Sequence, residues 1–481
     1  MGQTKVSLLI HINVLSIQKS SKSKNDMLKG DIKSTLIDMA IPMIFGMIML
    51  MTFGIVDTFF VSLIGTNELA AISFTFPVTF LIISFNIGLG IGTSAVIGKY
   101  LGSGDDSNAK VLATGSLMLV FILVGMLSLA GYFTIDFTFT LLGASATLLP
   151  IIYDYMSIWY IAGVLLAIPM VGNAVLRASG DTKTPSIIMA AGGGINVVLT
   201  PVLIFGYLGF PALGIKGAAI ATCIAWAVCV VWIIYLLAVK RELMEPRLLS
   251  WSEFVPASKG VLTIGLPAAG SNMLTPISAA IVTSIVAGYG AHAVAAWGVG
   301  NRIESLASIV VLALSMSLPP LISQNFGANQ FSRIHTAYRM CIKFILVWQF
   351  LMFVILVILA PYIASVFAAE ESVAQQITLF LLIVPIGYGF QGIIILTNSA
   401  FNAMHKPLAA MYLSLIRLFI CYVPITALGS YLYGLQGLFW GCVVANALAA
   451  GVSYYWFNRE IGLQKQADNE NYTRVNDVKR L

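Results

Sequence analysis

The stretch GIVDTFFVSLIGTNELAA at residues 54–71 returns in altered form as AAIVTSIVAGYGAHAVAA at residues 279–296. The same shift of 225 residues, from 54 to 279, aligns much of the first half of the chain with the second. It places Gly65 on Gly290 and, further out, Pro42 on Pro267. A repeat of this length predicts a duplicated fold with two like halves.

The composition indicates a membrane protein. Of the 481 residues, 59% are hydrophobic and only 10% are charged, whereas a soluble domain carries about a quarter charged residues. Apolar stretches of about 20 residues, long enough to cross a bilayer as helices, recur along the chain. They do not alternate as the strands of a membrane barrel would. We place twelve spans near 36–61, 73–98, 110–133, 148–172, 186–207, 214–239, 260–288, 297–323, 339–362, 376–402, 408–430 and 435–457.

The predicted fold is therefore an all-α membrane protein with twelve transmembrane helices in two pseudo-symmetric six-helix lobes. We expect a cytoplasmic extension at 1–33, an N-lobe at 34–239, a connector at 240–259, a C-lobe at 260–460 and a disordered cytoplasmic tail at 461–481. An even number of spans per copy gives both copies the same orientation, as in parallel-repeat transporters. Such lobes leave a cavity between them that opens alternately to the two sides.

The distribution of charge predicts the topology. Lys and Arg gather in the N-terminal segment, in the connector and in every second loop, whereas the intervening loops have almost none. The positive-inside rule then places both termini and the connector in the cytoplasm of a cell-membrane, multi-pass protein. This asymmetry also explains the net charge of +6, so the lipid bilayer is an expected partner and nucleic acid is not.

One acid distinguishes the first copy from the second, because Asp57 aligns with Val282. A carboxylate within an apolar span is a functional-site hypothesis by default. Burial disfavours its charged form, which suits it to bind and release a proton, and it can also ligate a cation where other oxygens converge. Polar residues on other spans of this half are candidate neighbours: Tyr155, Asn173, Asn196, Thr200 and Thr222.

Asn196 and Thr200 are four residues apart, so they share one face of their helix, and Pro201 favours a kink beside them. The alternative for these Asn and Thr side chains is ordinary hydrogen bonding between helices. For Asp57 it is a structural pair with a buried cation or water, and for Tyr155 an anchor at the membrane interface.

The second half carries a different polar set. Arg302 and Glu304 lie in the eighth span, Gln391 and Asn398 lie in the tenth, and Arg417 lies in the eleventh. Glu304 facing the cavity would attract a cation, with Arg302, Gln391 and Asn398 as its neighbours. The structural alternative is a buried ion pair that only stabilises the packing of helices.

Several function classes are excluded or disfavoured by absent motifs. There is no GxxxxGK[ST] phosphate loop, so ATP is not expected to drive transport directly. There is no HExxH, and the four histidines are scattered, so we expect no enzyme, no catalytic residues and no cofactor. A passive channel would not need a duplicated bundle with one asymmetric acid.

Several motifs resemble one known family. GIVDTFFVSLIGTNELAAISFTFP at 54–77, GIGTSAVIGKYLGSGD at 90–105 and NAVLRASGDTKTP at 173–185 are similar to multidrug and toxic compound extrusion (MATE) transporters of prokaryotic type. INVVLTPVLIFG at 195–206 and, in the second copy, ANQFSRIHTAYR and NSAFNAMHKP fit the same family, a branch of the multidrug/oligosaccharidyl-lipid/polysaccharide exporter superfamily. The resemblance covers about residues 35–460.

The resemblance implies a two-lobed exporter of cationic, amphiphilic small molecules that exchanges them for protons or sodium. The family's coupling acid in its VDT motif corresponds to Asp57, and its polar neighbours correspond to Tyr155, Asn173, Asn196 and Thr222. Many members have an acid where this chain has Thr200. A lone acid suits a proton better than a sodium ion, which Asp57, Asn196 and Thr222 would otherwise hold.

The sequence thus predicts a proton-coupled drug antiporter that works by alternating access, with Asp57 as the coupling acid. A sodium-coupled exporter is one alternative. A flippase for lipid-linked precursors is another, which Arg302 and Arg417 keep open because cations would be needed to hold phosphates. The internal duplication makes a monomer sufficient.

Overall fold

The computed structural model describes residues 27–368 and 370–480, with the side chains of 27–368 and 370–467. Within these residues the fold is helical throughout and contains no strand, as the sequence predicted. The predicted extension at 1–33 lies mostly outside the described residues, which begin with a helical turn at Met27. By residue contacts the chain forms two compact units. Within the described residues, unit 1 comprises 27–31 and 37–269, and unit 2 comprises 32–36, 270–368 and 370–480.

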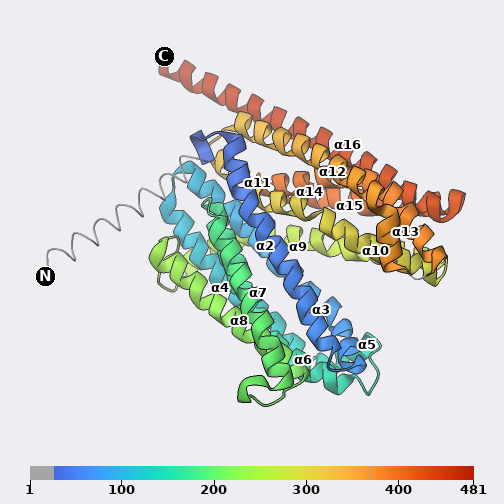
Figure 1. Ribbon diagram of the computed structural model, residues 1–481. Coiled ribbons are helices and arrows are strands. Elements are labelled where there is room, and N and C mark those ends of the chain that lie inside the picture. The colour runs from blue at the N-terminus through green and yellow to red at the C-terminus, as the bar shows by residue number, and fades with distance from the viewer. Residues whose placement is uncertain (1–26, 369, 481) are drawn as a thin grey trace. The chain divides into compact units, whose positions relative to one another are not determined.

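Unit 1 is built around α6, which packs against α3, α4 and α8, while α7 packs against α8 (Figure 1). Its helices are α2 (Ile32–Ser62), α3 (Thr66–Ser103), α4 (Asp106–Phe133), α5 (Ile135–Leu141), α6 (Leu149–Ala178), α7 (Lys183–Phe205) and α8 (Ile215–Tyr235), followed by a π-helical turn at Leu236–Lys240. Small residues on these helices allow their backbones to approach closely. In a membrane, where lipid is as apolar as the helix surfaces, such close packing is what holds helices together.

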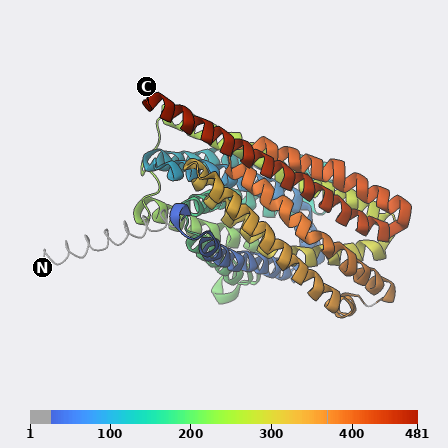
Figure 2. The same ribbon diagram turned by 90° about the horizontal axis from the view of Figure 1, so that it is seen from above.

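Unit 2 is organised around α14, which packs against α11, α12, α15 and α16. Its elements are the second half of α9 (Trp251–Ala287), α10 (Ala291–Ala307), α11 (Ile309–Gly327), α12 (Phe331–Phe367), α13 (Glu371–Ile383), α14 (Tyr388–Ala403), α15 (Pro407–Leu415), a π-helix at Ile416–Tyr422 and α16 (Val423–Arg480). The helix α16 packs against α14, and Figure 2 shows the helices of unit 2 from above.

The expected twelve crossings are present. Among the described residues, eleven helical stretches are long and apolar enough to cross a membrane. The last of them, Pro407–Ala467, holds two crossings, because Tyr433 and Gly434 leave helical geometry with φ of −133° and 62°. Close contacts between Gly429 and Gly437 then bring the two arms together as a hairpin. Eleven stretches therefore contain twelve helices.

Several spans differ in detail from the sequence prediction. The eighth, expected as one helix at 297–323, is broken at Ser308 into α10 and α11. The tenth, expected at 376–402, is interrupted by a 3₁₀ turn at Val384–Gly387, where Pro385 lacks the N–H that a continuous helix would use. The tail expected to be disordered from 461 continues α16 as helix to Arg480.

The border between the units lies within α9, between Ala269 and Gly270, and differs from the border expected at the connector 240–259. The first half of α9 is held on α3 by glycines without side chains. A Cβ at Gly88 would lie 2.6 Å from the backbone N of Ala269, and one at Gly92 would lie 2.5 Å from the carbonyl O of Val261. This backbone-to-backbone contact joins the start of the second repeat to unit 1.

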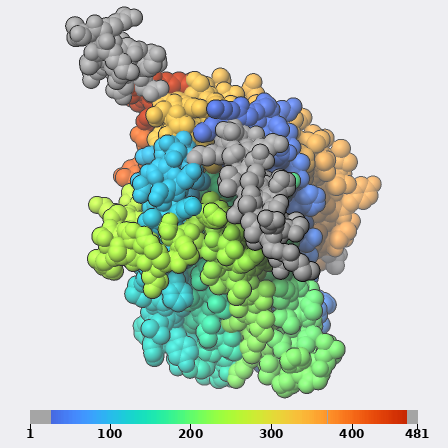
Figure 3. Space-filling view, turned by 90° about the vertical axis from the view of Figure 1, so that its left-hand side faces the viewer, coloured from blue at the N-terminus to red at the C-terminus, as the bar shows by residue number. Residues whose placement is uncertain are grey.

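The connector itself is held against unit 1. The Thr114 hydroxyl donates to the carbonyl of Glu245 over 3.1 Å and accepts from its N–H over 2.9 Å. Arg241 forms an ion pair with Asp181. In Figure 3 the yellow-green surface after α8 adjoins the cyan surface at the start of α4. The segment that links the two repeats is thus packed against unit 1 through these contacts and is not a flexible linker.

Large apolar side chains also cover the outside of the helices. Phe45, Phe133 and Val366 are 63%, 76% and 78% exposed. Exposed apolar surface on this scale is unusual for a soluble protein and is expected where lipid surrounds the helices.

Candidate functional site

The contact between α2 and α7 sets the position of Asp57. Ser186, Gly193 and Thr200 are seven residues apart on α7, so they form a stripe along one face. A Cβ at Gly193 would lie 1.5 Å from Cδ2 of Phe53, so the Phe53 ring occupies the space that a side chain would take. One turn beyond Phe53 on α2, Asp57 meets Thr200, one step further along the stripe.

A chain of hydrogen bonds links Asp57 to two neighbouring helices. The Thr200 hydroxyl donates to Oδ1 of Asp57 over 3.2 Å and lies 3.5 Å from Oδ1 of Asn196. Asn196 donates from Nδ2 to the Thr222 hydroxyl on α8 over 3.1 Å, and Thr222 donates to the carbonyl of Ala218 over 3.0 Å. The structure therefore brings together four of the residues that the sequence singled out, in what we call the Asp57 network.

Shielding from water adds to the strength of this network. Thr200 is fully buried, and Asp57, Asn196 and Thr222 are half-buried. A hydrogen bond between groups withdrawn from water is electrostatically stronger than one in solvent, and an unpaired group there is correspondingly costly. Asp57 is therefore hydrogen-bonded directly to α7, and α7 is hydrogen-bonded in turn to α8 through Asn196 and Thr222.

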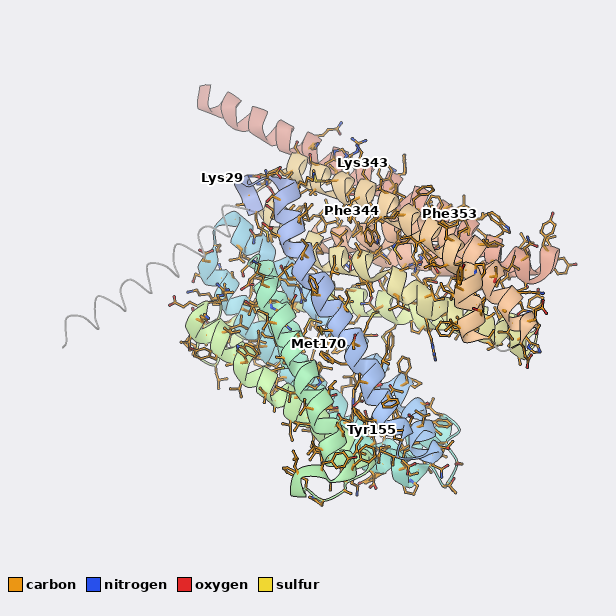
Figure 4. The ribbon with its side chains drawn as sticks, in the orientation of Figure 1. Lys29, Tyr155, Met170, Lys343, Phe344 and Phe353 are labelled. Atoms are coloured by element: carbon orange, nitrogen blue, oxygen red, sulfur yellow. The ribbon has the colours of Figure 1, made fainter. Side chains whose placement is uncertain are left out.

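Tyr155 lies beside the Asp57 network on α6. Its side chain is only 7% exposed and is near enough to Asp57 to interact with it electrostatically. Figure 4 labels Tyr155 and Met170 at two different levels of α6. The burial of Tyr155 argues against a simple interface anchor and favours a place in the wall of the site.

Asn173 is separate from this group. It lies 18 residues after Tyr155 on the same helix, which corresponds to roughly 27 Å at about 1.5 Å per residue. Its amide oxygen is buried without a hydrogen-bond partner, and no hydrogen bond within the described residues joins it to the Asp57 network. At the shift of 225 residues Asn173 aligns with Asn398 of the second repeat, so the occurrence of Asn at both positions reflects the duplication.

The ligand set determines which ions Asp57 can hold. Among the described residues, no group of three or more His, Cys, Asp and Glu side chains gathers at one place. Asp57 carries the one carboxylate of its network, and the other oxygens belong to a neutral amide and two hydroxyls. These residues can bind and release a proton at Asp57. They do not provide the several charged oxygens that typically coordinate a metal cation.

In unit 2 the predicted residues lie in three places. Oε1 of Glu304 on α10 accepts a hydrogen bond from Nε2 of Gln391 on α14 over 3.0 Å. Arg302 is exposed, because a separation of two residues places it on the opposite side of α10. Asn398 donates from Nδ2 to the Ser414 hydroxyl on α15 over 3.0 Å. Gln391 thus joins Glu304, while Arg302 and Asn398 do not.

Some contributors could not be found by sequence reasoning. In the sequence, Phe53 looks like any lipid-facing aromatic residue and Gly193 like any small residue of a span. Their contact could not be predicted, because it depends on which residue of another helix lies opposite the glycine. Tyr388 and Tyr422, both close enough to Glu304 to interact electrostatically, come from different elements of unit 2. Among so many apolar aromatics, no local pattern distinguishes these two.

A multi-pass membrane chain with two like helical bundles and an acid inside one of them has the architecture of a secondary transporter. The MatE family model matches residues 42–202 and 267–428, one match in each repeat. The chain belongs to this family, and it is a MATE transporter. The members of this family are transporters and not enzymes, which agrees with the expectation from the sequence.

Individual relatives match most of the chain. A protein of Shewanella oneidensis named "FAD transporter" is 41% identical over 91% of this chain and 97% of its own length. The "Probable multidrug resistance protein YoeA" of Bacillus subtilis is 31% identical over 64% of this chain and 67% of its own. The crystal structure of the Vibrio cholerae MATE transporter VcmN in the bent form is 34% identical, covers 92% of this chain and 99% of VcmN, and has a TM-score of 0.86.

Proposed function

We propose that this protein is a proton-driven antiporter that exports amphiphilic small molecules by alternating access of its two lobes, with Asp57 as the coupling acid. The observation that carries the proposal is the Asp57 network itself. It joins three helices of one repeat through a single carboxylate, and the other repeat has Val282 at the aligned position.

The coupling step follows from the hydrogen bonds. With Asp57 ionised, its carboxylate is an acceptor for the Thr200 hydroxyl. Proton uptake from the outside turns one carboxyl oxygen into a donor and removes the charge that orders its neighbours. The contacts of α2 with α7 then change, and the exported molecule is released outward. Loss of the proton to the cytoplasm restores the first arrangement, and the next molecule binds.

Protons are favoured over sodium as the coupling ion. A bound sodium ion needs several oxygens directed at one point, whereas a proton needs one carboxylate oxygen. In the Asp57 network the Thr200 and Thr222 hydroxyls already use their protons within the network, and Asn196 turns its amide nitrogen to Thr222. Sodium coupling through Asp57, Asn196 and Thr222 remains the alternative, and it would require these side chains to turn.

The exported compound has two candidate classes. The first is cationic or amphiphilic drugs, which the sequence predicted and which agrees with the name of the Bacillus relative. The second is a flavin nucleotide, and it is supported by the 41% identity to a protein named FAD transporter over 97% of that protein. A flippase for lipid-linked precursors has less support, because these relatives are named for small molecules.

The location follows from the family. The chain is a multi-pass membrane transporter with bacterial relatives, and we place it in the cell membrane. The positive-inside argument puts both termini in the cytoplasm. A monomer suffices for the proposed mechanism, because the Asp57 network lies wholly within unit 1.

The test is efflux from proteoliposomes loaded with either ethidium or FAD, driven by an imposed pH gradient or an imposed sodium gradient. We expect the pH gradient to drive export, and Asp57→Asn to abolish it. Asp38→Asn is the matched control, because Asp38 is an exposed acid on the same helix, and we expect it to leave transport unchanged.

Each result has a defined meaning. Export driven only by sodium would establish the alternative coupling ion. Export of FAD without ethidium, or the reverse, would identify the substrate class. Full pH-driven export by Asp57→Asn would contradict the proposed mechanism.

A further inference from the structure

Unit 2 contains a polar cluster, partly buried, that the Asp57 mechanism does not use. Glu304 on α10 is bonded to Gln391 on α14, and Tyr388 lies one turn before Gln391 on the same helix. Arg417 and Tyr422 come from the π-helix Ile416–Tyr422 and are near enough to Glu304 to interact with it electrostatically. Five polar side chains from three elements therefore meet inside one membrane-embedded unit.

The local backbone around Arg417 is unusual. The helical stretch from Pro407 widens at Ile416–Tyr422 into π-helical geometry, which is rare and is often found at functional sites. An arginine in this position is costly in a membrane unless it faces a cavity or a partner. The aligned position of Glu304 in the first repeat, 225 residues earlier, is the uncharged Thr79. The Glu304 carboxylate is thus particular to the second repeat.

Hydrogen-bond donors in this cluster are left unused. Nε of Arg417 is buried with no hydrogen-bond partner, and so is the hydroxyl of Tyr388, whose side chain is 3% exposed. No ion pair joins Arg417 to Glu304 within the described part of the chain, although the two charges attract each other. Gln391 holds the Glu304 carboxylate instead. Buried donors without partners are rare in native proteins and call for an acceptor.

We propose that Arg417 and Tyr388 form a subsite for an anionic oxygen, a phosphate or carboxylate group, of the molecule that the protein transports. A guanidinium matches such groups in geometry and charge, and a phenol adds a second donor. Glu304 is the internal counter-ion when the subsite is empty, and Gln391 keeps it from closing onto Arg417. The subsite selects exported molecules that carry an acid group on an apolar or aromatic body.

The inference rests on the proposed function only where it calls the bound molecule a transport substrate. Of the two substrate candidates, it favours the flavin nucleotide, which carries phosphate. Binding needs no ion gradient, so failure of the subsite and failure of Asp57 coupling appear in different experiments.

The experiment compares two probes that differ by one phosphate. Riboflavin and FMN share the ring and the sugar-alcohol chain, and the fluorescence of both reports binding to purified protein in phosphatidylcholine nanodiscs. We expect FMN to bind more tightly than riboflavin. In Arg417→Gln this preference should fall by about tenfold or more, as for the loss of a charge-assisted hydrogen bond. Riboflavin affinity should stay the same, which also shows that the variant is folded.

A second variant and a control keep the test decisive. Tyr388→Phe removes only the hydroxyl and should reduce the FMN preference by a smaller factor. If Arg417→Gln fails to fold, this variant carries the test. Lys343→Gln removes an exposed cation from the same unit and should leave both affinities unchanged.

Three results would overturn the proposal. The first is that FMN binds no more tightly than riboflavin, or that neither binds. The second is that the FMN preference survives in both Arg417→Gln and Tyr388→Phe. The third is that phosphatidylglycerol in the nanodisc abolishes the preference of the wild type and has no effect in Arg417→Gln. That result would assign the subsite to a lipid headgroup and not to a substrate.

Discussion

Replacing Gly193 by alanine tests whether the contact between α2 and α7 positions Asp57. The added Cβ would lie 1.5 Å from Cδ2 and 1.9 Å from Cε2 of Phe53. Carbon atoms in contact normally stay about 3.5–4.0 Å apart, so the ring or the helix has to move by roughly 2 Å. The Asp57–Thr200 hydrogen bond, at 3.2 Å, would not survive a shift of that size.

The expected cost follows from the same geometry. Overpacking of this kind destabilises a protein by about 1–3 kcal/mol, so we expect a lower melting temperature and a loss of pH-driven transport of about tenfold. The assay is efflux from proteoliposomes beside thermal unfolding of the purified protein. Gly194→Ala is the matched control, because a Cβ there would meet nothing within 4 Å.

A compensating change makes the reasoning refutable. Phe53→Ala removes the ring, so the double variant with Gly193→Ala should recover much of the transport that the single glycine change loses. Equal activity of Gly193→Ala and Gly194→Ala would refute the account of the contact. Failure of Phe53→Ala to rescue a defective Gly193→Ala would do the same.

Two further predictions concern the connector 240–259 and the start of α4 in unit 1. Thr114→Val removes both hydrogen bonds to the backbone of Glu245, so limited proteolysis should cut the connector faster. Ser116→Ala is the control: it loses only a hydrogen bond within its own helix and should be cut at the wild-type rate. Asp105→Ala should speed hydrogen exchange in the first turn of α4, because Asp105 accepts hydrogen bonds from the side chain and the backbone of Asn108. These bonds hold the pKa of Asp105 below its ordinary value, so the cap is complete at neutral pH and is lost only as the pH falls through that lowered pKa. Unchanged proteolysis in Thr114→Val, or unchanged exchange at neutral pH in Asp105→Ala, would contradict these predictions.

The span pattern could be predicted from the sequence because each crossing needs about 20 apolar residues. The repeat supported the number of crossings, because both copies must contain the same number of spans. The interruptions could not. Ser308 and the π-helix at Ile416–Tyr422 break or widen helices at places where the apolar pattern continues unchanged. The border within α9 depends on the glycines of α3, which lie far away in the sequence.

The candidate site likewise has a part that could be predicted from the sequence and a part that could not. Asn196 and Thr200 could be paired from their spacing of four, which is a property of one helix. Thr222 and Asp57 come from other helices, and their contacts with this pair depend on packing. Asn173 was included as a polar residue of another span in the same half, yet the length of α6 keeps it about 27 Å from Tyr155. Local spacing is readable in a sequence, whereas the meeting of helices is not.

The central claim is that Asp57 exchanges a proton for substrate, and proton release measures this directly. Substrate is added to weakly buffered, detergent-solubilised protein with a pH-sensitive dye, for the wild type and for Asp57→Asn. The account predicts release of about one proton per bound molecule by the wild type and none by Asp57→Asn. Equal proton release by both proteins, or binding by the wild type without any release, would contradict it.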